Sequence, residues 1–238
     1  MDDTQRNWLL ALSSPMVALN HKAGALYSGE NLWTANNSEE AKKFFEGSWN
    51  INSRDDLINT IVRMADYGHA ESLGVDFFYW PQSLPSEKQT KYKTPPVNTI
   101  DVQLAYIEGS YYLTDGGGIK AWDIVRLCFL IRNGIDANYL NSDEAFFLMS
   151  RLGKRAHYWY KSWNAYYAGY LIGRLLWLSQ EQTSVAKQNE FLNGDNGSWI
   201  SDHLYQILYH SNNPANSLEW FTPCPNIKPP STLSDVKL

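Results

Sequence analysis

The chain has 238 residues, a formal net charge of -5 and 19% charged residues. Its 44% of hydrophobic residues supplies ample material for a core and excludes a globally disordered chain. The acidic balance argues against a general nucleic-acid coat protein and against a basic membrane-surface binder. Aromatic residues are frequent, with 10 Trp, 15 Tyr and 9 Phe.

Cysteine content and hydropathy point to a reducing compartment. Two cysteines, Cys128 and Cys224, are too few for a disulfide framework. The acidic residues 1–4 lack the basic start and apolar run of a signal peptide. The most apolar long stretch, residues 163–178, contains Arg174 and is shorter than the roughly 20 residues of a membrane span. We therefore expect a soluble, cytoplasmic protein.

The first 98 residues contain helix signals followed by a break. Apolar spacing predicts a helix over about residues 5–12. Small polar caps followed by acids predict helix starts at residues 37–40 and 53–56, and the second helix ends near Gly68. Residues 77–80 are a short candidate strand. Four prolines predict that residues 81–98 form a long surface loop.

The following stretch of 97–213 contains no proline, which permits long helices. We expect helices over about 99–112 (capped by Thr99), 119–132 (stopped by Asn133 and Gly134), 141–160, 162–178 (capped by Ser162) and 199–210. Five prolines make residues 212–238 an irregular tail. The expected fold is all-α: a single domain over residues 1–238, a bundle of about seven helices with the motif helices of 119–178 at its centre.

The two central helices combine apolar faces with a few charges. Asp123 and Arg126 lie three residues apart on an otherwise apolar helix and can pair on one face. One interpretation is an ion pair that holds the bundle in register. The other is a site in an aromatic-lined pocket, where arginines hold a phosphate or carboxylate and Glu144 is the plausible acid or base. The candidate ligand-binding residues are Asp123, Arg126, Arg132, Glu144, Trp163, Tyr170, Arg174 and Trp177.

A basic and aromatic cluster lies at the end of the helix predicted over 141–160. Its candidate contact residues are Arg151, Lys154, Arg155 and Trp159. Such a cluster suits phosphate or RNA, or it neutralises a helix C-terminus while its aliphatic stems cover apolar surface.

Other chemical motifs are weak. Gly116, Gly117 and Gly118 lack the Gly-Lys-Ser/Thr ending of a P-loop and are better read as a turn. The histidines follow no metal-ligand spacing, and no nucleophile elbow exists. We therefore expect no metal and no cofactor, and no catalytic residue can be named.

Several spaced motifs resemble those of one bacterial family. They are Ala121-Trp122-Asp123-x-x-Arg126, Arg132-x-Gly134, Tyr139-Leu140-x-x-x-Glu144-Ala145, Ser162-Trp163 and Gly169-Tyr170-x-x-Gly173-Arg174-x-x-Trp177. In this order they resemble the family catalogued as domain of unknown function 1266. Asn138 stands where the family pattern has glycine, and asparagine tolerates the left-handed conformation. The resemblance supports the fold and the motif residues, and implies no reaction.

Three functions remain open. The first is a non-catalytic protein-binding module, most concretely an immunity protein that neutralises a secreted toxin. The absence of a catalytic set and the many Tyr and Trp residues suited to interfaces favour it. The alternatives are a small-ligand-binding protein or enzyme that uses the arginine and acid site, and a nucleic-acid contact through residues 151–161. No membrane partner is expected.

Overall fold

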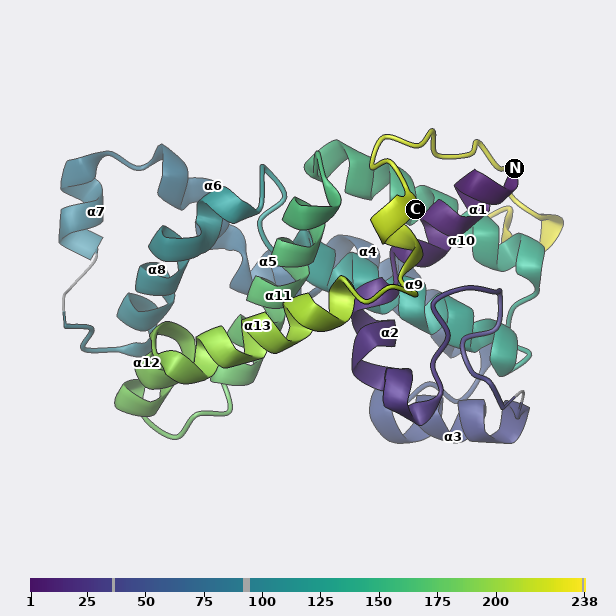
Figure 1. The fold of residues 1–238 in the computed structure, drawn as a ribbon, viewed down its shortest axis with the longest axis horizontal. Coiled ribbons are helices and arrows are strands. Elements are labelled where there is room, and N and C mark those ends of the chain that lie inside the picture. Colours follow the sequence, from purple (N-terminus) through teal and green to yellow (C-terminus); the bar gives the residue numbers. More distant parts are fainter. Residues whose placement is uncertain (36, 92–94, 237) are drawn as a thin grey trace. The chain divides into compact units, whose positions relative to one another are not determined.

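The computed structural model describes residues 1–35, 37–91, 95–236 and 238, without the side chains of 195–197 and 199–201. Figure 1 shows the helices of this chain. Apart from one isolated β-bridge between Ala25 and Trp33, the regular elements of the described residues are helical. The all-α class predicted from the sequence is therefore confirmed.

The chain folds into two compact units. Unit 1 comprises Met1–Gly68, Asp123–Tyr158 and Ile207–Leu238, and unit 2 comprises His69–Trp122 and Trp159–Gln206. The bundle of about seven helices is not confirmed, because helices α1 to α13 and several 3-10 turns are present among the described residues. The additional helices are mostly short. One of them begins at Ser184, whose side chain accepts from the Lys187 N–H.

The helices of unit 1 come from three stretches of the chain. They are α1 (Asp3–Ala11), α2 (Ser14–Asn20), η1 (His21–Ala23), α3 (Ser38–Trp49), α4 (Arg54–Tyr67), α9 (Lys120–Asp136) from Asp123 onward, α10 (Ser142–Trp159), η4 (Pro214–Ser217) and η5 (Ser231–Leu233).

Unit 2 contains most of the remaining helices. They are α5 (His69–Leu73), α6 (Val75–Tyr79), η2 (Trp80–Gln82), α7 (Pro85–Lys91), α8 (Thr99–Ser110), η3 (Tyr111–Leu113), α11 (Trp163–Ser179), α12 (Val185–Asn193) and most of α13 (Asp195–Leu208). Helix α8 packs against α12 and α6, and α11 packs against α5 and α12.

Polar caps start the helices largely where the sequence predicts them. The side chains of Asn37, Ser53 and Ser162 accept backbone N–H groups at the starts of α3, α4 and α11. Asn141 and Glu144 form a reciprocal capping box at the start of α10. Helix α8 is capped by Asn98, so the expectation of a Thr99 cap is wrong by one residue.

Two expectations for residues 77–98 are wrong. The candidate strand at 77–80 is helix α6 followed by η2, and the expected loop of 81–98 contains η2 and α7. Pro81 and Pro85 lie in first helical turns, where the missing N–H has no intrahelical partner to lose. Residues 92–94 lie outside the described residues.

Helix α9 continues past its predicted end. Asn133 and Gly134 are within the helix, which ends at Asp136. The Asn133 side chain is buried, accepts from Trp33 Nε1 at 2.6 Å and donates to the Ala41 carbonyl at 3.3 Å. The reversal falls instead at Asn138, which adopts the left-handed conformation with φ 58°.

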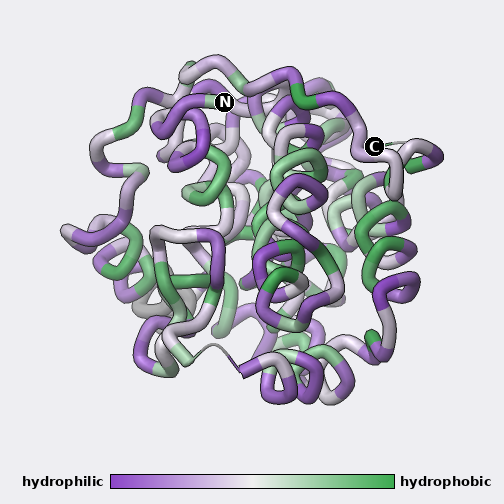
Figure 2. Tube along the Cα trace, turned by 90° about the vertical axis from the view of Figure 1, so that its right-hand side faces the viewer, coloured by the Kyte–Doolittle hydropathy of each residue, from purple (hydrophilic) through white to green (hydrophobic). Residues whose placement is uncertain are grey.

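Each unit has a core of its own. In Figure 2 hydrophobic and hydrophilic residues alternate along the helices, as expected where one face is buried. The core of unit 2 includes Phe77, Trp80, Leu104, Ile119, Ile172 and Leu176. The core of unit 1 includes Trp8, Phe45, Ile61, Phe129, Phe147 and Leu208. The tail of 212–238 is largely irregular, as expected, and buries Trp220 and Leu233.

Candidate functional site

Asp123 and Arg126 form the predicted pair in unit 1. Arg126 Nη1 lies 3.4 Å from Asp123 Oδ1, and both side chains are largely buried, with 12% and 8% exposed. The Arg126 guanidinium also lies over the Trp49 ring, 4.8 Å from its centroid. Stacking on an aromatic face suits a guanidinium whose hydration is restricted. These contacts agree with the structural interpretation of the pair.

Arg132 is separately fixed inside unit 1. Its guanidinium is fully buried and donates to the carbonyls of Leu26, Gly29 and Asn31 and to the hydroxyl of Ser13, at 2.6–3.2 Å. Burial lowers the pKa of Arg132 to about 10, although the Asp136 carboxylate favours the charged form. Since even this pKa leaves the group charged at neutral pH, Arg132 acts as an internal cation that organises the loop before α3.

Glu144 is also committed to structure. Its carboxylate accepts from Arg54 Nη2 at 2.6 Å, from Thr232 Oγ1 at 2.5 Å and from the Asn141 N–H. Burial raises the pKa of Glu144, but the hydrogen bonds from Thr232, Asn141 and Arg54 outweigh it and leave the pKa below its ordinary value. Glu144 therefore links Arg54 to the C-terminal tail. None of these three hydrogen bonds involves Asp123 or Arg126.

Unit 2 holds an aromatic group built from the motif residues of α9 and α11. Trp122 lies 5.4 Å from Tyr170 and 5.9 Å from Trp177, measured between ring centroids. His69 stacks with both tryptophans, and Trp122 Nε1 donates to His69 Nδ1 at 3.2 Å. Trp163 lies apart from this group in the first turn of α11, against Tyr166 and Tyr167.

Arg174, on α11, is a motif arginine for which the described residues supply no ion pair. It lies on α11 four residues after Tyr170 and three before Trp177, so all three share a face of the helix. Its side chain is half-buried. Within the described part of the chain, no hydrogen bond or ion pair to Arg174 is found.

The basic and aromatic cluster of 151–161 does not form one surface patch of unpaired cations. Arg155 donates to the Ala65 carbonyl and to Asp66, Lys154 donates to Asn226, and Arg151 lies over the Phe147 ring. These contacts are all within unit 1. Trp159 belongs to unit 2, where it contacts Phe78 and Lys120.

The Tyr160 side chain packs against the glycine-rich turn of Gly116–Gly118. Tyr160 Oη donates to the Gly118 carbonyl at 2.9 Å and accepts from the Ala121 N–H at 2.8 Å. A side chain at Gly117 would overlap the Tyr160 ring, and Gly118 has a positive φ of 51°. The Gly118 carbonyl and the Ala121 N–H are thus both hydrogen-bonded to Tyr160. This arrangement agrees with the interpretation of Gly116–Gly118 as a turn.

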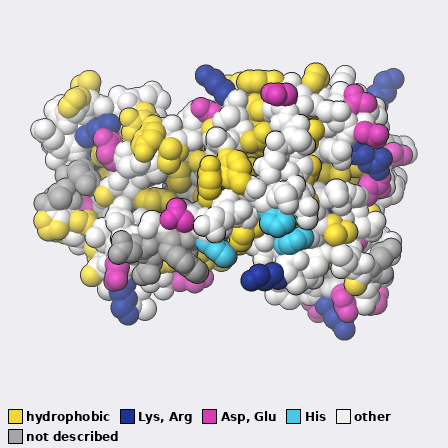
Figure 3. All heavy atoms as spheres, viewed as in Figure 1, with side chains coloured by type: hydrophobic (Ala, Val, Ile, Leu, Met, Phe, Trp, Pro, Cys, Tyr) yellow, Lys and Arg dark blue, Asp and Glu magenta, His cyan; other side chains and the backbone are white. Residues whose placement is uncertain are grey.

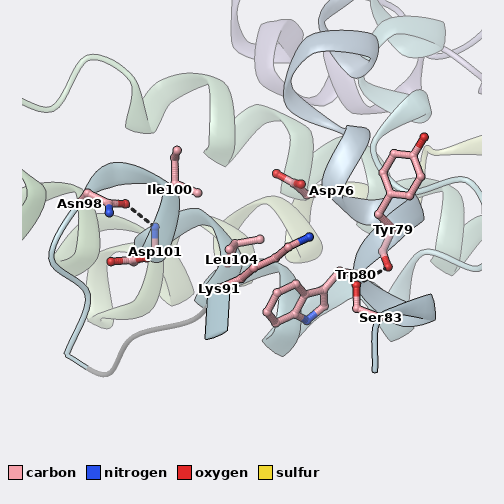
Figure 4. Close-up of a pocket in the computed structure, with 9 residues that line it drawn as sticks. All are labelled: Asp76, Tyr79, Trp80, Ser83, Lys91, Asn98, Ile100, Asp101 and Leu104. Carbon is pink, nitrogen blue, oxygen red and sulfur yellow. Dashed lines mark hydrogen bonds between the residues drawn. The ribbon is translucent and has the colours of Figure 1, made fainter. Parts of the chain in front are cut away.

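A pocket of about 430 Å³, which the sequence reasoning missed, opens in unit 2 between α6, η2 and α8. We call it the α6–α8 groove (Figure 4). Trp80 and Leu104 are its buried floor, whereas Tyr79 and Ile100 are 65% and 60% exposed at its rim. Hydrophobic side chains are visible at the surface over α6 in Figure 3. The groove is lined by Asp76, Tyr79, Trp80, Ser83, Lys91, Asn98, Ile100, Asp101 and Leu104.

Of the exposed apolar residues in and just after the polar segment of 81–98, Ile100 lines the groove, whereas Leu84 and Val97 do not. The polar segment of 81–98 and the start of α8 carry isolated large apolar residues, namely Leu84, Val97 and Ile100. All three are at least 60% exposed in the structure. Single exposed apolar residues are common on protein surfaces, so these residues do not locate the groove from the sequence alone.

No group of three or more His, Cys, Asp or Glu side chains in the described ranges is arranged to hold a metal ion. Within those ranges, too, no helix combines the length and the apolar character needed to cross a membrane. Burial raises the pKa of the Cys128 thiol and that of Cys224 to about 11, so both thiols are poor nucleophiles.

Comparison with known families decides the relationship. The family described as "Protein of unknown function (DUF1266)" matches residues 45–220. The chain belongs to the DUF1266 family. The motif residues of α9 and α11 fall inside the matched region, so the DUF1266 resemblance noted from the sequence is confirmed.

Two proteins of Escherichia coli K12 are similar to this chain. "Uncharacterized protein YbeU" is 35% identical over 182 residues, which cover 76% of this chain and 75% of YbeU. "Uncharacterized protein YbeR" is 32% identical over 247 residues, which cover 99% of both chains. No solved structure matches the chain.

Proposed function

We propose that this DUF1266 protein is a non-catalytic binding module that holds a protein partner in the α6–α8 groove. The observation that carries the proposal is the rim of this groove, where Tyr79 and Ile100 are largely exposed above a floor of Trp80 and Leu104. Tyrosine and tryptophan are the residues most enriched at binding hot spots. A concave site with an apolar floor and a few polar groups suits an anchoring side chain of a partner.

The internal partners of the buried charged side chains also favour binding over catalysis. Arg132 is bound to carbonyls, Glu144 to Arg54 and Thr232, and Asp123 to Arg126. An acid or base that works in catalysis must reach a substrate proton. In each of these groups the charge instead meets an internal partner.

A small anionic ligand at Arg174 is a second candidate. The observation in its favour is the half-buried guanidinium without an ion pair in the described residues, on the helix face that also carries Trp177. A guanidinium and an aromatic face together suit a carboxylate or phosphate attached to a ring. Loss of ligand-induced thermal stabilisation in Arg174→Met would support this candidate.

A secreted toxin is the most specific partner we consider. An immunity protein needs a surface that covers the toxin's active cleft, and we assign this contact to the exposed rim residues Tyr79 and Ile100. Co-expression with a candidate toxin would test this form of the proposal. Protection by the wild-type protein that is lost in Tyr79→Ser would support it.

Nucleic acid is a weaker proposal, because Lys154 and Arg155 are engaged by Asn226 and Asp66.

A pair of matched tyrosines tests the general proposal. Tyr79 and Tyr112 both lie in unit 2 and are 65% and 68% exposed, but only Tyr79 lines the groove. We expect Tyr79→Ser to reduce the amount of a stoichiometric co-purifying protein at least about tenfold, measured by quantitative mass spectrometry. Tyr112→Ser should retain it. Equal retention by both variants would contradict a role for the groove.

A further inference from the structure

A second, smaller pocket lies in unit 1, and none of its lining residues lines the α6–α8 groove. It has a volume of about 230 Å³ and lies between Trp33, Thr34, Ala35 and the first two turns of α3. Pockets for drug-sized ligands span roughly 300–1,000 Å³. The smaller volume suits a single head group. The pocket is lined by Ala23, Trp33, Thr34, Ala35, Asn37, Glu40, Ala41 and Phe44.

Two aromatic rings form walls of this pocket. The rings of Trp33 and Phe44 have centroids 6.2 Å apart and are inclined at 64°. Both side chains are half-buried. Trp33 is fixed because its Nε1 donates to Asn133 Oδ1 at 2.6 Å, and Phe129 packs against both rings. The walls therefore keep their angle without a ligand.

One carboxylate supplies the charge. Glu40 is the sole charged residue among the described lining residues, and no ion pair to it is found within the described ranges. The Asn37 side chain is used as the cap of α3, where it accepts the N–H groups of Glu39 and Glu40. The neighbouring Glu39 does not line the pocket and pairs with Lys42 at 2.9 Å.

These features select one class of ligand. Aromatic faces attract cations through their quadrupole, and rigid rings beside a carboxylate suit cations that carry methyl groups. Small inclined walls exclude a large planar ligand. We propose that the Trp33–Phe44–Glu40 pocket binds a quaternary or methylated ammonium head group. This proposal is independent of the α6–α8 groove, so either can fail alone.

Choline is the probe for a direct test. Titration into ¹⁵N-labelled protein is followed by the indole Nε1–H resonance of Trp33, assigned by its loss in Trp33→Phe. We expect a saturable shift, and binding at least about fivefold weaker for 3,3-dimethylbutan-1-ol, which has the same shape without the charge. The absence of a saturable shift, or equal binding of the neutral alcohol, would overturn the proposal.

Two neighbouring glutamates provide the matched control. Glu40 is exposed, so Glu40→Gln removes the charge without changing the core. We expect Glu40→Gln to weaken choline binding about threefold, while Glu39→Gln binds as the wild type does. Sedimentation with phosphatidylcholine vesicles, reduced in Glu40→Gln and not in Glu39→Gln, would identify a lipid as the carrier of the head group. Binding of free choline without sedimentation would identify a small molecule. Equal weakening by both glutamine variants would overturn the assignment to this pocket.

Discussion

Arg132 shows how a buried charge can serve the fold of unit 1. Its Nη2 group donates hydrogen bonds to three carbonyls of residues 26–31, a segment about one hundred positions earlier in the sequence. Asp136, one turn later on α9, accepts from the Leu32 N–H and from Asn31 Nδ2. Together the two side chains satisfy the backbone of a loop that has few bonds of its own.

Removal of the Arg132 guanidinium is therefore expected to be costly. Arg132→Met keeps the approximate volume but leaves the carbonyls of Leu26, Gly29 and Asn31 without their donor. We expect the free energy of unfolding to fall by roughly 3–5 kcal/mol, measured by urea denaturation. Lys154→Met on α10, which loses an exposed hydrogen bond to Asn226, should change it by less than about 0.5 kcal/mol. Similar values for the two variants would contradict this role.

His157 gives unit 1 a predicted pH dependence. Its ring lies 4.3 Å from the Trp8 ring, and its Nε2 lies 2.8 Å from the Trp220 carbonyl. Burial lowers the pKa of His157, partly offset by that carbonyl. The unfolded chain therefore takes up the proton first, so stability is complete above about pH 6.5 and decreases as the pH falls below it.

A glutamine at this position separates the titration from the hydrogen bond. In His157→Gln the amide can still donate to the Trp220 carbonyl, but nothing titrates. We expect the fall in melting temperature between pH 7.5 and pH 5.5 to be smaller in this variant than in the wild type. His210→Gln, at an exposed histidine, is the control and should keep the wild-type slope. An unchanged slope in His157→Gln would contradict the burial argument.

Single residues were predictable where their partner lies nearby in sequence. Asp123 and Arg126 are three apart on a helix, and this spacing alone predicted their pair. Arg132 was also singled out, but its acceptors lie in a loop that no local pattern links to α9. The sequence makes Glu144 the plausible acid or base of one alternative. Its bonds to Arg54 and Thr232 connect distant parts of the chain, so no local pattern predicts them.

At the scale of elements, one glycine determines how α11 meets the first turn of α9. A Cβ at Gly173 would lie 2.5 Å from Trp122 Cβ and 3.2 Å from Ile119 Cβ. These atoms lie next to the backbone and cannot rotate away. The glycine in the Gly173-Arg174 motif is thus explained by close packing within unit 2.

A pair of glycine substitutions tests this packing. We expect Gly173→Ala to lower the free energy of unfolding by roughly 1–3 kcal/mol through overpacking, despite the better helix propensity of alanine. Gly47 lies inside α3, and a Cβ there would meet nothing within 4 Å. Gly47→Ala should therefore raise stability by roughly 0.5–1 kcal/mol. Urea denaturation that shows the same sign for both variants would refute the close-packing explanation.

Elements with strong local caps were predicted well, and those that depend on tertiary contacts were not. Asn37, Ser53 and Ser162 start their helices through bonds within three residues. Prolines were read as breaks over 81–98, although a proline in a first turn favours a helix. Trp80 and Leu104 stabilise this region because they bury apolar surface in the core of unit 2.

At the scale of the whole molecule, the charged residues expected to form one site are distributed among several local structures. The surplus of aromatic residues is partly explained by the His69, Trp122, Tyr170 and Trp177 group, and partly by Trp80 and Tyr79 at the α6–α8 groove. Membership of the DUF1266 family was predictable because its motifs are local sequence patterns. The groove was not, since it needs the packing of α6 against α8.

Site-specific photocrosslinking tests the central claim, that a protein partner occupies the α6–α8 groove. Benzoylphenylalanine at position 79 or 100 would place the reactive group at the rim, and at position 112 it provides an equally exposed control in unit 2. After irradiation of cells that produce the protein, we expect one discrete protein adduct from positions 79 and 100 and none from 112. No adduct at the rim, or the same adduct at all three positions, would contradict the account.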